Sequence, residues 1–205
     1  MGEMANYRYY NIRRLLDDPE IGEEVVKEML SSFQCPLNPD VEAFLKVNAI
    51  EFTKKSQSVT YLVMSDVGDM DLLGYFTLAI KPLSIRDRES FSHNMKKRIS
   101  RTSELDKESN TYSTSAYLIA QLGKNYSNEI SHHIGGKDLL ASAIQAIREL
   151  QYRAGGSIVF LEAEEKEKLM QFYESKENGF IRFDERQVAQ GKNEGLELIQ
   201  MMKLI

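Results

Sequence analysis

Two histidines, two glycines and a lysine stand together at 132–137, and an apolar helical pattern follows them directly. Residues of these types suggest a metal site, a nucleotide-phosphate loop, or a helix start that binds another anion. Zinc needs three or four nitrogen, sulfur or oxygen ligands at defined spacing. His132 and His133 are sequence neighbours whose side chains usually diverge, His93 is the only other histidine, and Cys35 is the only cysteine. We therefore predict no metal site.

The phosphate loop of nucleotide-hydrolysing proteins is excluded by spacing. Its pattern requires a glycine at position 131 and a hydroxyl residue at 138, whereas this chain has Ser131 and Asp138. The glycine pattern of dinucleotide-binding folds is absent as well. What remains is a strand, a loop and a helix start, where N–H groups lie at the positive end of a helix dipole. Gly135 and Gly136 have no Cβ, so they either let a phosphate-bearing ligand approach the backbone or merely permit a tight turn.

The composition is that of a globular chain of 205 residues, long enough for one well-cored domain. A formal net charge of −5 argues against a surface that binds nucleic acid as a whole. A local basic cluster at 96–101 precedes acidic residues, which is typical of a solvated helix face. No apolar run approaches the about 18 residues of a membrane helix, and the first residues lack a signal-peptide core. With a single cysteine, we expect a reducing, cytoplasmic compartment and no membrane partner.

The hydrophobic pattern predicts an alternation of strands and helices. We expect strands at 6–16, 59–64, 72–80, 116–122, 157–163, 180–183 and 196–205, and helices at 19–30, 39–52, 136–154 and 164–175. Along the second helix, the face expected to be shared consists of Val41, Phe44, Leu45, Asn48 and Phe52. The charged, weakly periodic segment 81–112 is interpreted as an insertion with one or two short helices. The pattern predicts one α/β domain over 1–205, with a central mixed sheet flanked by helices.

A second constellation consists of a strand, a short loop and a helix that ends at an Asn-Gly-Phe turn. Phe172 and Tyr173 stand seven and six residues before Gly179. Together with the strand, loop and helix over 116–154, this arrangement resembles the core of the GNAT (Gcn5-related) N-acetyltransferase family. The order of blocks over 33–80 and 116–183 resembles one branch of that family, the toxin-type acetyltransferases, whose best-known members acetylate the amino group of aminoacyl-tRNA.

The resemblance implies a GNAT-like fold with a splayed sheet and acetyl-CoA as co-substrate. The helix start would hold the pyrophosphate, and main-chain groups of the splayed strand would bind the pantetheine arm. The cofactor-binding residues implied in this way are Leu122, Gly123, Lys124, Ile134, Gly135, Gly136, Lys137 and Lys166. Ser131 stands in place of the family's Arg or Gln, and Ile134 in place of its first glycine, so the loop is less open than usual. Lys166 stands where the family often has an asparagine, and its ammonium would approach a phosphate instead.

The resemblance also implies that Tyr173 gives its phenol proton to the departing thiolate as general acid. A main-chain N–H near 122–124 would polarise the thioester oxygen. From the pattern alone, Tyr173 is equally an aromatic residue packed on an amphipathic helix beside Leu169 and Phe172. Glu162 is a poorly defined candidate for the general base. The candidates for binding the acceptor are Asn125, Lys97, Arg98 and Arg101.

Several acceptors and one other class of function stay open at this point. The toxin-type branch implies the α-amine of charged tRNA, while the acidic charge and the insertion leave protein, peptide and small-molecule amines open. A non-catalytic CoA-binding module, whose insertion holds a protein partner, is the alternative. The toxin analogy further implies a small ribbon–helix–helix antitoxin encoded nearby. A homodimer is left open, because the terminal strands give no clear signal of oligomeric state.

Overall fold

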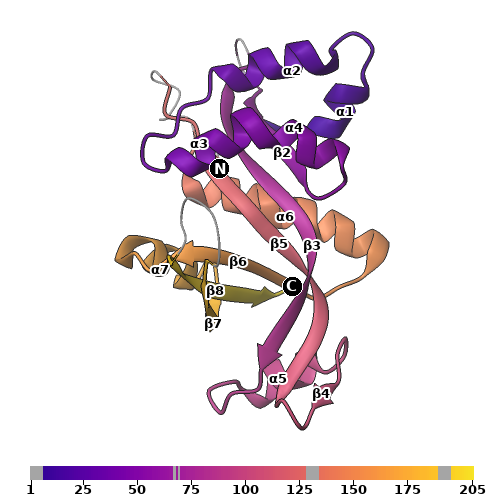
Figure 1. Ribbon diagram of the computed structural model, residues 1–205, viewed down its shortest axis with the longest axis vertical. Coiled ribbons are helices and arrows are strands. Elements are labelled where there is room, and N and C mark those ends of the chain that lie inside the picture. Colours follow the sequence, from indigo (N-terminus) through magenta and orange to yellow (C-terminus); the bar gives the residue numbers. More distant parts are fainter. Residues whose placement is uncertain (1–6, 67, 69, 128–133, 189–194) are drawn as a thin grey trace, which may run out of the picture. The chain divides into compact units, whose positions relative to one another are not determined.

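The computed structural model describes residues 7–66, 68, 70–127, 134–188 and 195–205 (Figure 1). Its strands are β1 (Tyr7–Asn11), β2 (Val59–Ser65), β3 (Leu72–Arg86), β4 (Leu105–Asp106), β5 (Thr111–Lys124), β6 (Ile158–Glu164), β7 (Ile181–Gln187) and β8 (Glu197–Leu204). Its helices are α1 (Ile12–Asp17), α2 (Gly22–Ser31), α3 (Pro39–Ala43), the π-helix η1 (Phe44–Asn48), α4 (Ala49–Lys54), α5 (His93–Ile99), α6 (Gly136–Ala154) and α7 (Glu167–Glu174). In this part of the chain, no helix is both long and apolar enough to span a membrane.

The strands form one eight-stranded mixed sheet in the order β1-β2-β3-β5-β6-β8-β7, with β4 paired to β5. β5 and β6 run parallel, while the pairs β1–β2, β2–β3, β6–β8 and β7–β8 are antiparallel. The parallel register consists of Tyr117 with Val159 and Leu118 with Phe160, and β5 continues from there to Lys124. The predicted α/β fold with a central mixed sheet and flanking helices is confirmed.

The chain divides into two compact units. The first unit consists of 1–79 and 119–147, and the second of 80–118 and 148–205. Each has a hydrophobic core of its own.

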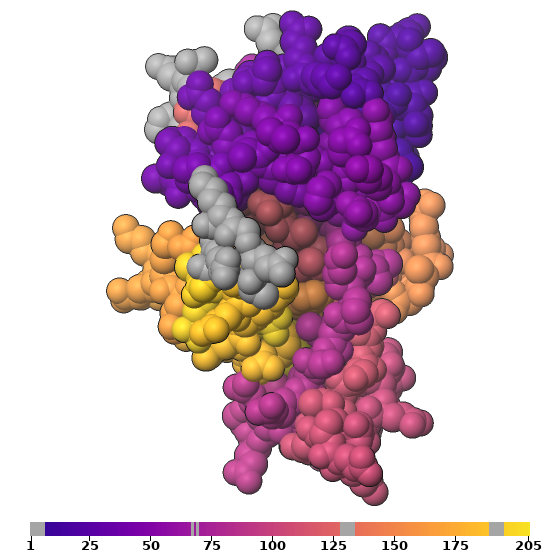
Figure 2. Space-filling model, in the orientation of Figure 1, coloured from indigo at the N-terminus to yellow at the C-terminus, as the bar shows by residue number. Residues whose placement is uncertain are grey.

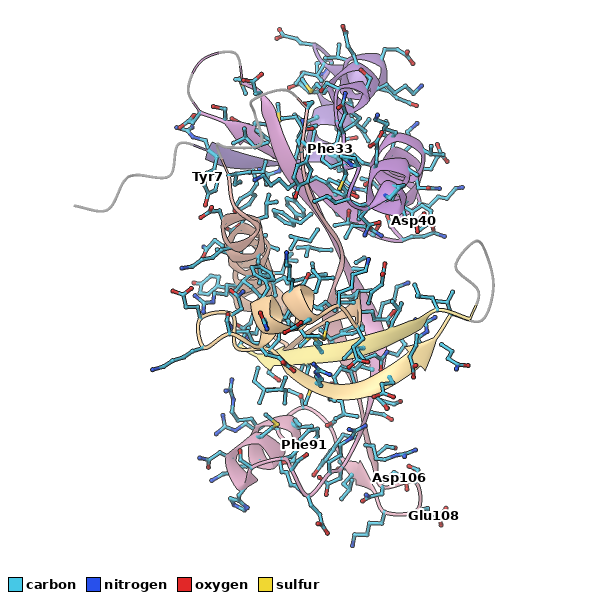
Figure 3. The ribbon with its side chains drawn as sticks, turned by 90° about the vertical axis from the view of Figure 1, so that its left-hand side faces the viewer. Tyr7, Phe33, Asp40, Phe91, Asp106 and Glu108 are labelled. Carbon is cyan, nitrogen blue, oxygen red and sulfur yellow. The ribbon has the colours of Figure 1, made fainter. Side chains whose placement is uncertain are left out.

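Helices α1 to α4 pack against β2 and β3 in the core of the first unit. Phe33 lies between the strands and these helices (Figure 3), and its ring meets that of Tyr75 edge to face at 5.2 Å. The Tyr75 hydroxyl donates a hydrogen bond to the carbonyl of Val41 at 2.6 Å, and burial raises the pKa of this phenol far above its ordinary value. In Figure 2, the indigo and violet side chains of these helices form a continuous outer layer.

The buried face of the segment 39–54 differs from the predicted one after Leu45. Phe52 is 37% exposed, whereas Ala49 and Thr53 are fully buried. The reason is the π-helical turn η1, whose wider turn delays the rotation of the helix by about one residue. The prediction assumed an unbroken α-helix of 3.6 residues per turn.

The core of the second unit joins the ends of β3 and β5 to β6, β7, β8 and α5. Its buried members are Leu83, Ile85, Phe91, Ile99, Tyr112, Ala116, Ile158, Phe160, Phe183 and Met202. Phe91 lies beside α5 (Figure 3). One of the helices expected within 81–112 is therefore present as α5, but its flanks are strand, since β3 runs on to Arg86 and β5 begins at Thr111. Charged residues in these two strand segments hide the alternation of buried and exposed positions, so the sequence pattern did not predict strands there.

Candidate functional site

The end of β5, which supplies three of the predicted cofactor-binding residues, passes closely over the core of the first unit. A Cβ on Gly123 would lie 2.5 Å from Val41 Cγ1 and 2.6 Å from Tyr75 Cε1. Leu122 is half-buried, and the Lys124 ammonium stands 5.5 Å from the centre of the Tyr126 ring. The binding of pantetheine by main-chain groups of this stretch stays a prediction.

Gly74 of β3 is a residue of this region that the sequence analysis missed. A Cβ there would lie 2.7 Å from the carbonyl oxygen of Gly123 and 2.8 Å from Leu139 Cδ2. The absence of a side chain lets β3 come close both to the end of β5 and to the second turn of α6. The signal was available, because an isolated glycine inside a strand often marks the close approach of another backbone.

The start of α6, predicted to hold a pyrophosphate, is capped by its own side chain. The Gly135 N–H donates to Asp138 Oδ2 at 2.9 Å, while the Asp138 and Leu139 N–H groups donate to the Gly135 carbonyl at 3.1 and 3.2 Å. A carboxylate in the first turn is stabilised by the helix dipole, as in a capping box. One of the expected anion donors is thus already engaged by a negative charge.

The residues around this helix start differ in what they expose. Ile134 is only 4% exposed, so it belongs to the core. Gly136 and Lys137 are exposed. Ser131, His132 and His133, for which the sequence analysis also made predictions, lie outside the described residues.

A hydroxyl chain joins β1 to the first turns of α6. The Ser142 hydroxyl donates to the Asp138 carbonyl at 2.9 Å, and the Tyr7 hydroxyl is hydrogen-bonded to Ser142. Burial and the nearby Asp138 carboxylate raise the pKa of Tyr7. Figure 3 labels this tyrosine at the start of the described chain. Asp138 was missed because the capping-box motif begins with Ser or Thr, whereas Gly135 stands at that place here. Ser142 and Tyr7 were missed because their contacts join segments far apart in the sequence.

Asn125 has a structural role and not the predicted role in binding the acceptor. Its side chain is fully buried, and Oδ1 accepts from the N–H groups of Gln34 and Ser127 at 2.9 and 3.0 Å. Nδ2 donates to the carbonyl of Leu72 at 2.7 Å. The amide therefore holds together the end of β5, the start of β3 and the chain after α2.

Tyr173, the predicted general acid, lies in the last turn of α7 in the second unit. It is 9% exposed, and its ring makes edge contacts with Phe172 at 5.0 Å and Phe180 at 5.9 Å. Burial raises the pKa of Tyr173 to about 12. The phenol therefore keeps its proton throughout the neutral range, so it can serve as a proton donor and not as a base.

Two residues that hold the turn after Tyr173 were also missed. Asn178 Nδ2 donates to the Phe172 carbonyl at 2.7 Å, and the Phe180 N–H donates to the Tyr173 carbonyl at 3.0 Å. The Lys203 ammonium of β8 donates to the Asn178 carbonyl at 2.6 Å. The Asn-Gly-Phe signal indicated a turn, but the lysine comes from the far end of the chain and has no sequence signal.

Two charged candidates near α7 are engaged with other charges. The Lys166 ammonium lies 2.6 Å from Glu164 Oε2 on an exposed surface, where an ion pair contributes little and can be exchanged for another anion. Glu162, the weak candidate for the base, accepts from Arg186 Nη1 at 3.1 Å and from Gln200 Nε2 at 2.7 Å. Its carboxylate thus belongs to a network on the sheet, which argues against a role as base.

The basic cluster on α5 is divided between paired and exposed residues. Lys96 lies 2.8 Å from Asp87 Oδ1, and Arg98 Nη2 donates to the Ile205 carbonyl at 3.1 Å. Lys97 on α5 and Arg101 in the turn after this helix are both exposed. Of the three predicted contacts to the acceptor, Arg98 is therefore partly engaged within the protein.

Comparison with models of known protein families and with curated protein sequences gives no match for this chain. Solved structures match it over nearly its whole length. A mutant of the toxin AtaT bound to the C-terminus of the antitoxin AtaR and acetyl-CoA is 18% identical, with a TM-score of 0.58, over 97% of this chain and 93% of AtaT. AtaT complexed with acetyl-methionyl-tRNA is 19% identical, with a TM-score of 0.60, over 94% and 93% of the two chains. A mutant of KacT is 18% identical, with a TM-score of 0.60, over 94% of each chain.

At this level of identity the likeness establishes the fold. The chain has the architecture of AtaT and KacT, with an eight-stranded mixed sheet and flanking helices. The GNAT-like fold predicted from the two constellations is thereby confirmed, and so is the resemblance to the toxin-type branch at the level of fold.

Proposed function

We propose that this chain is an acetyl-CoA-dependent N-acetyltransferase that transfers the acetyl group to a primary amine. The observation that carries the proposal is the buried phenol of Tyr173. It lies in a chain whose fold is similar to that of the toxin AtaT, which was solved with acetyl-CoA. The proposal treats residues 1–205 as one N-acetyltransferase domain, with the charged segment 81–112 as an insertion.

Each group of residues has a distinct role in this reaction. Acetyl-CoA supplies the acetyl group as a thioester. The amine nitrogen adds to the thioester carbon and loses a proton to water, and the carbon–sulfur bond then breaks. Tyr173 gives its phenol proton to the departing sulfur and regains one from solvent. A main-chain N–H at 122–124 stabilises the negative oxygen of the intermediate. Main-chain groups at 134–137 and the Lys166 ammonium hold the phosphates, with Asp138 as an opposing charge.

We propose charged tRNA as the acceptor. The complex of AtaT with acetyl-methionyl-tRNA, together with the exposed Lys97 of α5 and Arg101 of the following turn, supports this choice. An α-amine of an aminoacyl ester is partly neutral near pH 7, so the reaction requires no strong base. We also propose a ribbon–helix–helix antitoxin as a protein partner, and the antitoxin AtaR bound to AtaT supports a partner of this kind.

The test is acetyl transfer from radiolabelled acetyl-CoA to a pool of charged tRNA. Deacylated tRNA and the Tyr173→Phe variant serve as controls. We expect label on charged tRNA only, and its loss in the variant. A separate binding measurement gives the association constant of the protein for charged tRNA at several salt concentrations. Replacing Lys97 and Arg101 with alanine should weaken this binding and reduce the slope of the logarithm of the constant against the logarithm of the salt concentration by about 1 to 2, because up to two phosphate contacts are removed.

Other outcomes separate the alternatives. Release of CoA with peptides or small amines, without label on tRNA, would keep the acetyltransferase and exclude the tRNA acceptor. Tight binding of CoA, with no transfer to any amine, would favour a non-catalytic module. An unchanged salt slope would show that α5 does not contact the tRNA.

A further inference from the structure

We infer that Asn178 and Lys203 are positioning residues for Tyr173, since they clamp the turn after α7 and thereby fix the direction of the phenol. This inference rests on the proposed acetyl transfer and adds two residues to it. Neither residue needs to touch a substrate. Both act through the backbone and the aromatic neighbours of the tyrosine.

The two peptide groups on either side of the Tyr173 Cα are both anchored. The last carbonyls of an α-helix have no partner inside the helix. Here the Phe172 carbonyl accepts from Asn178 Nδ2 at 2.7 Å, and the Tyr173 carbonyl accepts from the Phe180 N–H at 3.0 Å. The direction of the Cα–Cβ bond of Tyr173 is therefore set by the turn and not by the helix alone.

The turn itself is closed tightly enough to transmit this constraint. Gly179 adopts φ +65°, a region that other residues rarely occupy, and its N–H donates to the Ser175 carbonyl at 2.8 Å. Asn178 is 9% exposed, and its own N–H donates to Ser175 Oγ at 3.3 Å. Loss of the Asn178 amide would free one of the two anchored peptide groups.

Lys203 anchors the turn to the sheet. Its ammonium donates to the Asn178 carbonyl at 2.6 Å and stands 6.0 Å from the centre of the Phe180 ring. Val159 of β6 pairs with Lys203 in a register that runs along β8, so the anchor is rigid. Burial and the neighbouring Arg148 lower the pKa of Lys203.

The aromatic rings carry the constraint to the reacting group. The Phe180 ring, which the Lys203 ammonium faces, meets the Tyr173 ring edge-on at 5.9 Å. The Tyr173 ring also makes an edge contact with the Phe172 ring, and the two ring centres lie 5.0 Å apart. Edge contacts of this kind fix ring orientation, and a small displacement of a catalytic group lowers the rate strongly.

The experiment uses Lys203→Met, which keeps the aliphatic stem, and Lys203→Arg, which keeps the donor. Lys176→Met is the matched control, because it removes a cation from an exposed position of the same turn. Transfer from acetyl-CoA to charged tRNA is measured for each variant, with and without Tyr173→Phe. We expect Lys203→Met and Asn178→Ala to lower kcat about tenfold, with KM for acetyl-CoA within about twofold. Lys203→Arg and Lys176→Met should have kcat values close to that of the unaltered protein.

The combination with Tyr173→Phe separates positioning from a structural role. If Lys203 acts through the phenol, Lys203→Met should add little to the loss already caused by Tyr173→Phe. A similar further loss in both backgrounds would overturn the inference, because it would reveal a general effect on the fold.

A second measurement is independent of turnover. The measurement is the NMR spectrum of protein labelled with 13C at tyrosine Cζ, the ring carbon that bears the hydroxyl. The Tyr173 signal is assigned by its absence in Tyr173→Phe. Lys203→Met should move this signal and Lys176→Met should not, and an unmoved signal would overturn the inference. Transfer that depends on Tyr173 but not on Lys203 would overturn the inference alone, whereas no transfer by the unaltered protein to any amine would overturn it together with the proposed function.

Discussion

The start of α6 and the end of α7 are built in opposite ways. In the proposed function, the start of α6 acts through main-chain N–H groups, and one of them is engaged by the Asp138 carboxylate. The end of α7 acts through one side chain, the Tyr173 phenol, while the main chain around it is tied by Asn178 and Phe180. A main-chain site depends on the path of the backbone, so its side chains can differ from a motif. A side-chain site depends on one residue and on what holds it.

The largest effect on catalysis should come from a change at Tyr173, at the end of α7. We expect Tyr173→Phe to lower kcat by at least about 100-fold, because a general acid contributes roughly two to four orders of magnitude. The urea midpoint should change little, since the ring and its contacts with Phe172 and Phe180 remain. Tyr152→Phe removes a hydroxyl from a residue that is 93% exposed and is the matched control. Equal kcat values for the two variants would remove the phenol from the mechanism.

The end of β5, whose proposed role depends on main-chain groups, should be sensitive to an added side chain. Gly123→Ala places a Cβ within 2.6 Å of the Val41 and Tyr75 side chains, so we expect a loss of about 1–3 kcal/mol in the free energy of unfolding. Urea denaturation measures this loss, and Ser115→Ala on an exposed position of the same strand is the control. If both variants were equally stable, β5 would have room for a side chain at 123, and the close packing described for it would be wrong.

The phenols of the two units should together govern stability at alkaline pH. Burial raises the pKa of Tyr173 to about 12 and that of Tyr75 further, whereas an unfolded tyrosine titrates near about 10. A raised pKa means that the folded protein holds its proton more tightly, so stability is complete below about pH 10 and is lost as pH rises towards 12. Each group contributes a slope of about 1.4 kcal/mol per pH unit in that window.

Urea midpoints measured from pH 9 to 12 follow this loss. Tyr173→Phe should reduce the slope by about one proton. A slope that did not respond to Tyr173→Phe would place this phenol in contact with solvent.

The smallest effect should come from the charge at the start of α6. Asp138→Asn removes a negative charge next to the proposed phosphate position but keeps an oxygen that accepts from the Gly135 N–H. We expect acetyl-CoA to bind about two- to fivefold more tightly, which corresponds to the usual strength of a charge at a helix terminus. Calorimetry measures this change, and Glu167→Gln in the first turn of α7 is the control. Weaker binding by Asp138→Asn would mean that the carboxylate helps to shape the loop for the ligand.

The fold and the elements at the two candidate regions could be predicted because each carries a local signal. Strong apolar periodicity placed α6, β6 and α7, and the Asn-Gly-Phe turn located the end of α7. The choice of Tyr173 followed from the family resemblance, and its catalytic role stays a prediction. The partners that hold these groups could not be predicted, since Lys203 and Gly74 come from strands far away in the sequence.

Asn125 was misread for a related reason. A polar residue just after a strand usually lies at the surface, and nothing local shows that Gln34 and Leu72 converge on it. The buried face after Leu45 was misread because a π-helical turn has no reliable sequence signature. Both errors concern tertiary contacts and helix phase, which local pattern does not contain.

The π-helical turn Phe44–Asn48 also bears on how other sequences should be aligned with this one. A homologue without the additional residue would carry its inward-facing side chains one place earlier after position 48. An alignment that keeps this segment free of gaps would then compare the buried Thr53 with an outward-facing neighbour. One gap within 44–48 restores equivalent positions.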